Sequence, residues 1–364
     1  MSRIGVVGGG PAGLLVASLT RDHEVVVFEE HPRVGLPRHC TSLVGRYTAS
    51  FLSQLLTSRV VGRGYKRFIF HTSLGDYTIE FGDEIAFYLR RPLLEEKLAE
   101  KAQSLGHVVK TGARAKPGGL TTVRVGEGTY VFDKIVVADG ARSEFYTFFH
   151  SGRRGLLYGV QAFVGHDSGD DAVHVDLSPR KAFFSWFLPL DSDVGIAGYI
   201  TGRHLADPRI MLRSLSKRMR VPFKKVFRFF GGVVVEPGFI SRPHVGGRVF
   251  FIGDALGLIK PFTYGGLYYI VRLAPKLVEA IGGKPENYVK EVEKLASFNR
   301  AESILASTKT QRLLSPVFLK LVNSSGLFNY MDYDEHYKLG VKSIISPLLL
   351  YPSLVKSIAE GLGK

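Results

Sequence analysis

The sequence has 364 residues, of which 45% are hydrophobic, and it carries a formal net charge of +15. This length and apolar content exclude a disordered or fibrous chain and predict a large core with more than one domain. The single cysteine, Cys40, excludes an intrachain disulfide. The positive charge indicates an anionic partner such as a membrane surface or an acidic substrate, although a solvated basic face would give the same composition. No motif of a nucleic-acid-binding domain accompanies the basic residues, so no nucleic-acid partner is expected.

An apolar run that suits a buried strand lies at residues 3–7 and leads into a glycine-rich turn. The turn has the spacing Gly8-x-Gly10-x-x-Gly13, and an apolar helix is expected directly after it, over residues 14–20. Gly8 permits the tight turn, Gly10 lets the backbone approach a pyrophosphate, and Gly13 lets the helix pack on the strand. The phosphates would then lie at the positive N-terminus of the helix.

A second expected strand, over residues 24–28, ends in Glu29, which is placed to accept a hydrogen bond from a ribose hydroxyl. A glycine turn alone is weak evidence, but here strand, glycines, helix, strand and acid follow in the order of a dinucleotide-binding unit. The residues expected to bind the dinucleotide in this unit are Gly8, Gly10, Pro11, Ala12, Gly13 and Glu29.

The next part of the chain mixes strands and helices. Residues 31–42 hold two prolines and a glycine and are expected to be irregular, with a helix resuming near Arg46. The elements expected after it are a hairpin over 68–81, a helix from Arg91-Pro92 to about 105, a strand over 108–111, a hairpin over 121–132 and a strand over 134–138.

From residue 158 the pattern becomes that of an antiparallel meander, inserted into the first domain. Its expected strands cover 158–165, 172–177, 181–189 and 194–200. A basic helix is expected near 210–220, a returning strand over 229–235, a buried strand over 248–252, helices over about 263–281 and 286–307, and a helical tail.

Acids and glycines follow two of the buried strands. Asp139-Gly140 ends one, and Gly253-Asp254 ends another, where open α/β sheets bind their ligands. Gly265-Gly266, which precede Leu267, offer bare backbone N–H groups at a helix start. Each motif alone could be an ordinary strand–turn connection, but all of them in this order are hard to obtain by chance.

These motifs resemble the single-Rossmann flavoproteins of the para-hydroxybenzoate hydroxylase superfamily, over most of the chain to about Leu273. The resemblance implies FAD as cofactor, with Asp254 at the ribityl chain and Glu29 at the adenosine ribose. It also implies that Arg91 lies near the cofactor and that the backbone at Ala113 lies near adenine. The expected fold is α/β with α+β inserts: a Rossmann-type FAD-binding domain (1–66, 91–150 and 235–300), an antiparallel-sheet substrate or catalytic domain (67–90 and 151–234), and a C-terminal helical region (301–364).

Within that superfamily the chain is most similar to the geranylgeranyl reductase family. Gly35-x-Pro37-x-x-Cys40 matches a loop that this family places beside the flavin, so that Arg38 and His39 are also expected at the cofactor. Phe184-Ser185-Trp186-Phe187-Leu188-Pro189 is similar to the family's Tyr-x-Trp-x-Phe-Pro strand, although Phe184 lacks the tyrosine's hydroxyl.

The resemblance implies reduction of carbon–carbon double bonds in a prenyl lipid or isoprenoid by reduced FAD. Phe184 and Trp186 would line the substrate pocket, and Cys40, or a water that it holds, would be the catalytic group near the reacting bond. Purely structural roles stay open for these residues: an aromatic strand usually belongs to the core, and a single cysteine is usually a small buried hydrophobic residue. No second GxGxxG unit follows, so an external donor, either a nicotinamide or a carrier protein, is expected to reduce the flavin. No metal is expected.

Two other functions remain as alternatives: a flavin monooxygenase that hydroxylates an apolar substrate, and a non-catalytic flavin-binding protein. A halogenase is disfavoured because halogenases carry Trp-x-Trp, and Trp186 is the single tryptophan.

The location of the protein is predicted from what precedes and follows these motifs. No signal peptide precedes the first strand, and residues 343–355 are too short and proline-broken for a transmembrane helix, which predicts a cytoplasmic protein. Residues 341–362 have apolar positions at helical spacing beside Lys342 and Lys356. This tail and the basic surface predict peripheral membrane contact, although the tail could equally pack on the body of the protein.

Overall fold

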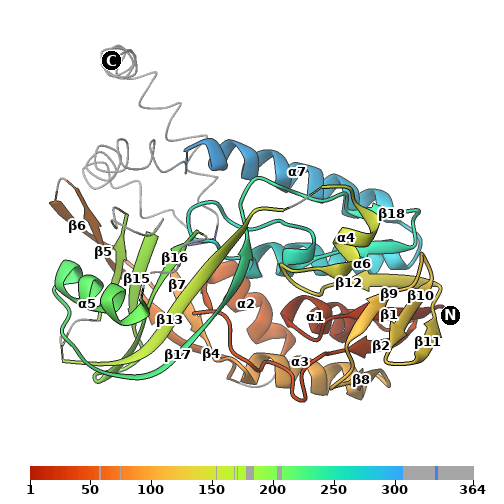
Figure 1. The fold of residues 1–364 in the computed structure, drawn as a ribbon, viewed down its shortest axis with the longest axis horizontal. Coiled ribbons are helices and arrows are strands. Elements are labelled where there is room, and N and C mark those ends of the chain that lie inside the picture. Colours follow the sequence, from red (N-terminus) through yellow and green to blue (C-terminus); the bar gives the residue numbers. More distant parts are fainter. Residues whose placement is uncertain are drawn as a thin grey trace, which may run out of the picture.

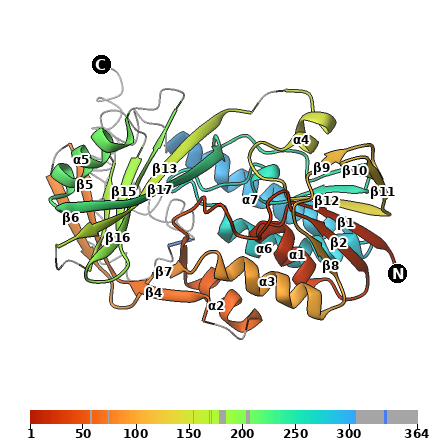
Figure 2. The same cartoon turned by 60° about the horizontal axis from the view of Figure 1, so that its bottom comes forward.

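The computed structural model describes residues 1–305, apart from 57–58, 74, 153, 168, 170, 178–183 and 203–206, together with Tyr333 and Asp334. It confirms the expected fold class: an α/β unit built on a mostly parallel sheet lies beside a second unit built on a largely antiparallel sheet (Figures 1 and 2). Most of the helical region expected over 301–364, including the tail at 341–362, lies outside the described residues.

The first sheet has the strand order β18-β19-β12-β1-β2-β8. All of its neighbouring strands pair in parallel except β18 with β19. Val7 is in register with Phe28 and with Val137, and Val137 is in register with Phe251, so these strands end at one edge. The strands are β1 (Arg3–Val7), β2 (Glu24–Phe28), β8 (Val108–Lys110), β12 (Lys134–Val137), β18 (His244–Val245) and β19 (Val249–Phe251).

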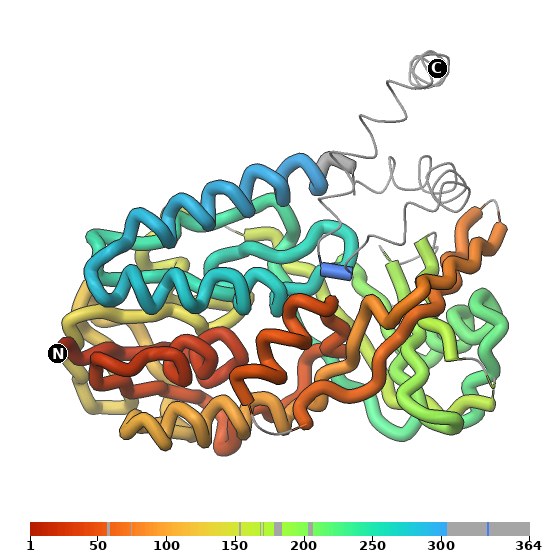
Figure 3. The backbone as a smooth tube through the Cα atoms, turned by 180° about the vertical axis from the view of Figure 1, so that it is seen from behind, coloured from red at the N-terminus to blue at the C-terminus, as the bar shows by residue number. Residues whose placement is uncertain are grey.

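Apolar helices cover this sheet. Leu14 and Leu15 of α1, Leu98 of α3 and Leu277 of α6 are buried in one core with the apolar residues of the strands. Figure 3 shows α6 and α7 side by side across the back of the molecule. The helices are α1 (Pro11–Leu19), α2 (Arg46–Leu55), α3 (Leu93–Ser104), α4 (Glu144–Phe149), α6 (Leu267–Ile281) and α7 (Pro285–Leu305), and η1 (Gly253–Ala255) is a short 3₁₀ turn. A small antiparallel sheet of β9 (Ala115–Pro117), β10 (Thr122–Val125) and β11 (Gly128–Val131) lies at the far end from the second unit (Figure 1).

The second unit is a seven-stranded sheet with the order β17-β13-β16-β15-β14-β5-β6. Only β14 and β5 pair in parallel; the other neighbours are antiparallel. The strands are β5 (Arg67–Thr72), β6 (Gly75–Glu80), β13 (Leu156–His166), β14 (Val173–Asp176), β15 (Phe184–Pro189), β16 (Val194–Thr201) and β17 (Phe223–Val235). Helix α5 (Pro208–Met219) packs on one face through Met211, Leu212 and Leu215. A three-stranded sheet of β3 (Leu43–Gly45), β7 (Ala86–Leu89) and β4 (Val61–Tyr65) completes the architecture.

Several elements differ in length from their sequence-based expectation, and for two of them, β17 and α6, the cause is clear. Strand β17 begins at Phe223 rather than near 229. The sequence pattern missed this start because the first half of the strand is a basic segment at the edge of the sheet and has no buried apolar face. Helix α6 begins at Leu267 rather than near 263, because Tyr264 has a left-handed φ of 55° and Gly265-Gly266 extend the turn.

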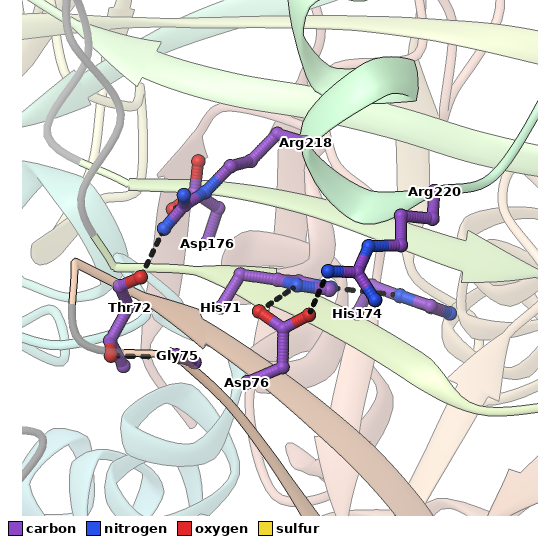
Figure 4. A network of polar contacts seen from close by, with 8 residues as sticks. All are labelled: His71, Thr72, Gly75, Asp76, His174, Asp176, Arg218 and Arg220. Carbon is purple, nitrogen blue, oxygen red and sulfur yellow. Dashed lines mark hydrogen bonds and ion pairs between the residues drawn. The ribbon is translucent and has the colours of Figure 1, made fainter.

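A polar network ties the end of α5 to the far strands of the second sheet (Figure 4). His71 Nδ1 is 2.9 Å from Asp76 Oδ1, and His71 Nε2 is 3.0 Å from His174 Nδ1. The two imidazoles are buried and stacked, with centroids 5.3 Å apart. Arg220 lies 3.9 Å from the same Asp76 carboxylate, so polar groups from the end of α5 and from β5, β6 and β14 are joined in one cluster.

Candidate active site

The three glycines of the first turn differ in how much space surrounds them: Gly8 and Gly13 are tightly packed, and Gly10 is not. Gly8 has φ +101°, and a Cβ there would lie 2.3 Å from the carbonyl oxygen of Ala138. A Cβ at Gly13 would lie 2.1 Å from the carbonyl oxygen of Gly8, so this position must be glycine for helix and strand to pack. A Cβ at Gly10 would meet nothing within 4 Å. The open space lies before Pro11, the first residue of α1, where backbone N–H groups favour an anion.

Glu29 follows β2 and is held close to this turn. Its Oε2 accepts a hydrogen bond from the backbone N–H of Gly9 at 2.8 Å. Its Oε1 accepts from the N–H of His31 at 2.8 Å and lies 2.6 Å from His31 Nδ1. The Ala113 N–H donates to the Glu29 carbonyl oxygen at 2.7 Å, which brings the two residues expected on the adenosine side together. His31 was not expected from the sequence.

Asp139 and Asp254 lie at the ends of the neighbouring strands β12 and β19. Burial raises the pKa of each carboxyl group to about 6. Arg154 lies nearby and partly opposes both shifts, and its guanidinium donates to the carbonyl oxygens of Asp254 and Ala255 at 2.7 and 2.6 Å. Asp139 Oδ1 is buried with no hydrogen-bond partner among the described residues. With pKa values of about 6, both carboxyl groups are still mostly ionised at neutral pH and can accept hydrogen bonds from a polyhydroxylated ligand beside the open glycine turn.

The starts of α1 and α6 meet at these acids. Gly253 has φ +67°, and a Cβ there would lie 3.0 Å from the Cβ of Ala12. A Cβ at Gly266 would lie 3.1 Å from Asp254 Oδ1, and one at Gly265 would lie 3.2 Å from Lys260 Cε. Leu267 is the first residue of α6. Gly140, with φ +80°, follows Asp139 at the same edge of the sheet.

The loop with Cys40 lies between the two large sheets. The Arg38 guanidinium donates to the Cys40 carbonyl oxygen at 3.2 Å and to the Tyr88 hydroxyl at 3.0 Å. His39 Nδ1 is 2.9 Å from the carbonyl oxygen of Gly231 on β17. The Cys40 side chain is half-buried, and its Sγ accepts from the Ser42 N–H at 3.2 Å.

Thr41 joins this loop to the strands of the second sheet. Its hydroxyl donates to Gln161 Oε1 and accepts from Trp186 Nε1 at 2.9 Å. Gln161 also donates to the carbonyl oxygen of His39 at 2.9 Å. The polar edge of Trp186 is therefore occupied, and its ring lies in contact with Phe184. These contacts pair residues far apart in the sequence, which is why periodicity gave no sign of Thr41 or Gln161.

Phe184 and Trp186 form an aromatic wall that reaches the α6 turn. Their ring centroids are 4.9 Å apart and stacked, and Phe184 stacks in turn on Tyr264 at 5.9 Å. Phe187, one residue further along β15, lies on the opposite face in the core under α5. The wall thus joins the second sheet to the loop that begins α6.

Arg91 lies next to the Cys40 loop, and its carbonyl oxygen accepts a hydrogen bond from the Arg38 guanidinium at 3.4 Å. The Arg91 guanidinium forms an ion pair with the fully buried Glu95, one turn along α3, and lies 3.5 Å from Ser42 Oγ. The Arg91 side chain therefore contacts the Cys40 loop at Ser42 and links this loop to α3.

Two further residues close this region and were missed by sequence reasoning. Lys260 Nζ is 2.8 Å from Asp334 Oδ1, and both side chains are almost fully buried. Asp334 Oδ2 accepts from the Gly45 N–H at 2.7 Å and from the Thr48 hydroxyl at 2.6 Å, at the start of α2. The Tyr333 ring lies 4.5 Å from Lys260 Nζ. No local pattern could have linked position 334 to position 45.

Among the described residues no cluster of three His, Cys, Asp or Glu side chains is arranged to hold a metal ion. No helix within the same residues is long and apolar enough to cross a membrane.

Comparisons with known proteins agree with this architecture. Residues 6–56 match the family model of the NAD(P)-binding Rossmann-like domain. An uncharacterised protein of Methanocaldococcus jannaschii is 23% identical over 98% of this chain and 96% of its own. The digeranylgeranylglycerophospholipid reductase of Methanosarcina acetivorans is 24% identical over 72% of this chain and 70% of its own. Over most of its length the chain is thus similar, at low identity, to proteins named as geranylgeranyl-type reductases.

Solved structures show the same fold as this chain. A geranylgeranyl bacteriochlorophyll reductase-like protein of Thermoplasma acidophilum superposes with a TM-score of 0.74 at 17% identity, over 99% of this chain and 98% of its own. A probable FAD-dependent monooxygenase of Pseudomonas aeruginosa gives 0.65 at 17% identity, over 87% of this chain and 99% of its own. Together with the sequence relatives, this fold supports an FAD-dependent oxidoreductase.

Proposed function

We propose that this protein binds FAD and reduces carbon–carbon double bonds of a prenyl lipid or isoprenoid. The observation that carries the proposal is the convergence of the Cys40 loop and the Phe184–Trp186 wall on the glycine turn that begins α6. An apolar wall beside a dinucleotide-type turn suits a substrate that offers few polar groups. The names of the sequence relatives give the substrate class.

The residues at the sheet edge fit FAD. The space at Gly10 would admit a pyrophosphate, and Glu29 lies beside Ala113 on the expected adenosine side. Asp139 Oδ1, which has no partner among the described residues, could accept a ligand hydroxyl, and Asp254 lies at the end of the neighbouring strand. When bound and reduced, the flavin would supply the hydride. An external nicotinamide or carrier protein would supply the electrons.

The chain's own task is then to hold the alkene and to deliver a proton. Phe184 and Trp186 would enclose the prenyl chain and exclude water from it. Because Cys40 Sγ accepts from the Ser42 N–H, the thiol hydrogen is free to point elsewhere. Tyr264 offers a second hydroxyl on the same wall, and burial raises its pKa to about 12, which keeps the phenol protonated at neutral pH.

Single-turnover kinetics tests this proposal. Photoreduced enzyme should be oxidised by a geranylgeranyl lipid under anaerobic conditions, and the product should carry fewer double bonds and no added oxygen. If Cys40 delivers the proton, Cys40→Ala should slow the reaction by roughly 10²–10⁴-fold with FAD affinity unchanged, and Cys40→Ser should retain more activity.

The parallel variant Tyr264→Phe tests the second hydroxyl. A large loss in Tyr264→Phe with wild-type rates in Cys40→Ala would remove the cysteine from the reaction. An oxygenated product formed in air would favour a monooxygenase, and FAD binding without turnover would favour a non-catalytic flavoprotein.

A further inference from the structure

Most of the first half of β17 is exposed. Strand β17 lies at the edge of the seven-stranded sheet, and β13 is its one partner among the strands of the described residues (Figures 1 and 2). Its six residues from 224 to 229 are all exposed. The apolar side chains of this segment are Val226, Phe227 and Phe229, with exposed fractions of 38%, 51% and 37%.

Three basic side chains lie among these apolar ones in the same segment. Lys224 pairs with Asp167 at 2.5 Å, Lys225 lies 5.2 Å from the centre of the Phe227 ring, and Arg228 is exposed. The preceding helix α5 also carries exposed side chains, among them Ile210, which is 59% exposed, Arg213 and Lys217.

The same strand leads directly to the candidate active site. Phe230, next to the exposed segment, packs on Phe163 at 5.0 Å, and the Arg38 guanidinium lies 5.3 Å from its ring. The following residue, Gly231, accepts the hydrogen bond from His39. The exposed segment therefore ends where the Cys40 loop begins.

We propose that residues 224–229 of β17 dock the protein on an anionic lipid bilayer. Cations interleaved with exposed aromatic and aliphatic side chains match the boundary between anionic headgroups and acyl chains. Pairing of this edge with a second copy of the chain is disfavoured for two reasons. The register between β13 and β17 is irregular at Phe163–Val164 and at Gly165–His166, and the exposed lysines oppose the addition of another strand. The proposal goes beyond the reaction assigned above and does not depend on it.

Vesicle co-sedimentation of the full chain at low salt tests this surface. The wild type should sediment with vesicles of phosphatidylglycerol and phosphatidylcholine and not with phosphatidylcholine alone. Lys225→Gln with Arg228→Gln should reduce partitioning on the order of tenfold, because each cation near an anionic surface contributes several-fold. Phe227→Thr with Phe229→Thr should also reduce it while keeping strand propensity.

Matched control variants lie on the other unit. Arg21→Gln with Lys116→Gln removes two exposed charges, and Val131→Thr with Leu120→Thr removes two exposed apolar side chains, 61% and 43% exposed. Both controls should bind like the wild type. The proposal is overturned if the wild type does not bind, if the controls lose as much as the β17 variants, or if the β17 variants keep wild-type binding. It is likewise overturned if those variants change only the oligomeric state or the binding of a single-stranded oligonucleotide. None of these readouts involves prenyl reduction, so failure here leaves the proposed reaction untouched.

Discussion

Gly8 and Gly10 lie two residues apart, and substitution should affect them in opposite ways. Gly10 is extended, with φ −79°, and has free space, so Gly10→Val should fold with a loss of about 1 kcal/mol or less and should lose FAD binding. Gly8→Ala combines a left-handed φ with a collision with Ala138 and should cost about 3 kcal/mol or more. Denaturant unfolding and flavin absorbance of the two variants separate these effects. Retention of FAD by Gly10→Val would contradict the pyrophosphate assignment.

The Asp254 carboxyl should make stability depend on pH in the ligand-free protein. Its pKa rises from 3.8 when exposed to about 6 in the fold, so the folded state favours the protonated form. The stabilisation is complete below about pH 3.8 and is lost as pH rises through 6. Asp254→Asn should therefore be more stable than the wild type at pH 8, by up to roughly 3 kcal/mol, and this advantage should vanish toward pH 4. A difference in the free energy of unfolding that does not change with pH would show that the carboxyl stays charged.

Local sequence was sufficient for some site residues and insufficient for others. The glycines and strand-end acids could be predicted because their constraint is local: a turn, a helix start, the end of a strand. Arg154, Thr41 and Gln161 could not, because each acts through a partner about 100 or more positions away. The positions of the glycines and acids could thus be predicted, while their cofactor-binding roles, like the roles of Cys40, Phe184 and Trp186, stay predictions.

At the scale of elements, the start of α2 depends on a distant carboxylate. Asp334 pairs with buried Lys260 and accepts hydrogen bonds from Gly45 and Thr48. Asp334→Ala should cost about 3–5 kcal/mol, because a buried ammonium is left without its partner. In the matched control, Glu24→Ala breaks the exposed Arg3–Glu24 pair and should cost less than about 1 kcal/mol. Chemical denaturation measures both, and equal losses would mean that water replaces Asp334 at Lys260.

Hydrophobic patterns in the sequence predict some strands and miss others. Hydrophobic periodicity predicted the buried strands β1, β2, β12 and β19, since each is a short apolar run. It missed the first half of β17, because an exposed edge strand has no apolar face to repeat. The small strands β3, β4 and β7 were missed as well, because their pairing depends on contacts between distant segments.

For the whole molecule, FAD should act as a ligand that stabilises the folded state. Its expected contacts lie on β1, β2, β12, β19 and α6, so the site exists only when the whole parallel sheet is formed. FAD at 100 times its dissociation constant should add about 2.7 kcal/mol to the free energy of unfolding. Thermal unfolding with and without FAD, with riboflavin as a control that lacks the pyrophosphate and adenosine, measures this gain. An equal shift with riboflavin would contradict binding across the glycine turn.

The stacked pair His71 and His174 fixes the hydrogen positions on both rings. An ionised Asp76 only accepts, so His71 carries its hydrogen on Nδ1, and in the neutral ring Nε2 must accept from His174 Nδ1. Both neutral imidazoles are then the Nδ1–H tautomer. If His71 takes up a proton, its Nε2 becomes a donor, and His174 must carry its own hydrogen on Nε2 instead. The ring nitrogen of His174 that carries hydrogen on β14 thus depends on the hydrogens of the His71 ring on β5.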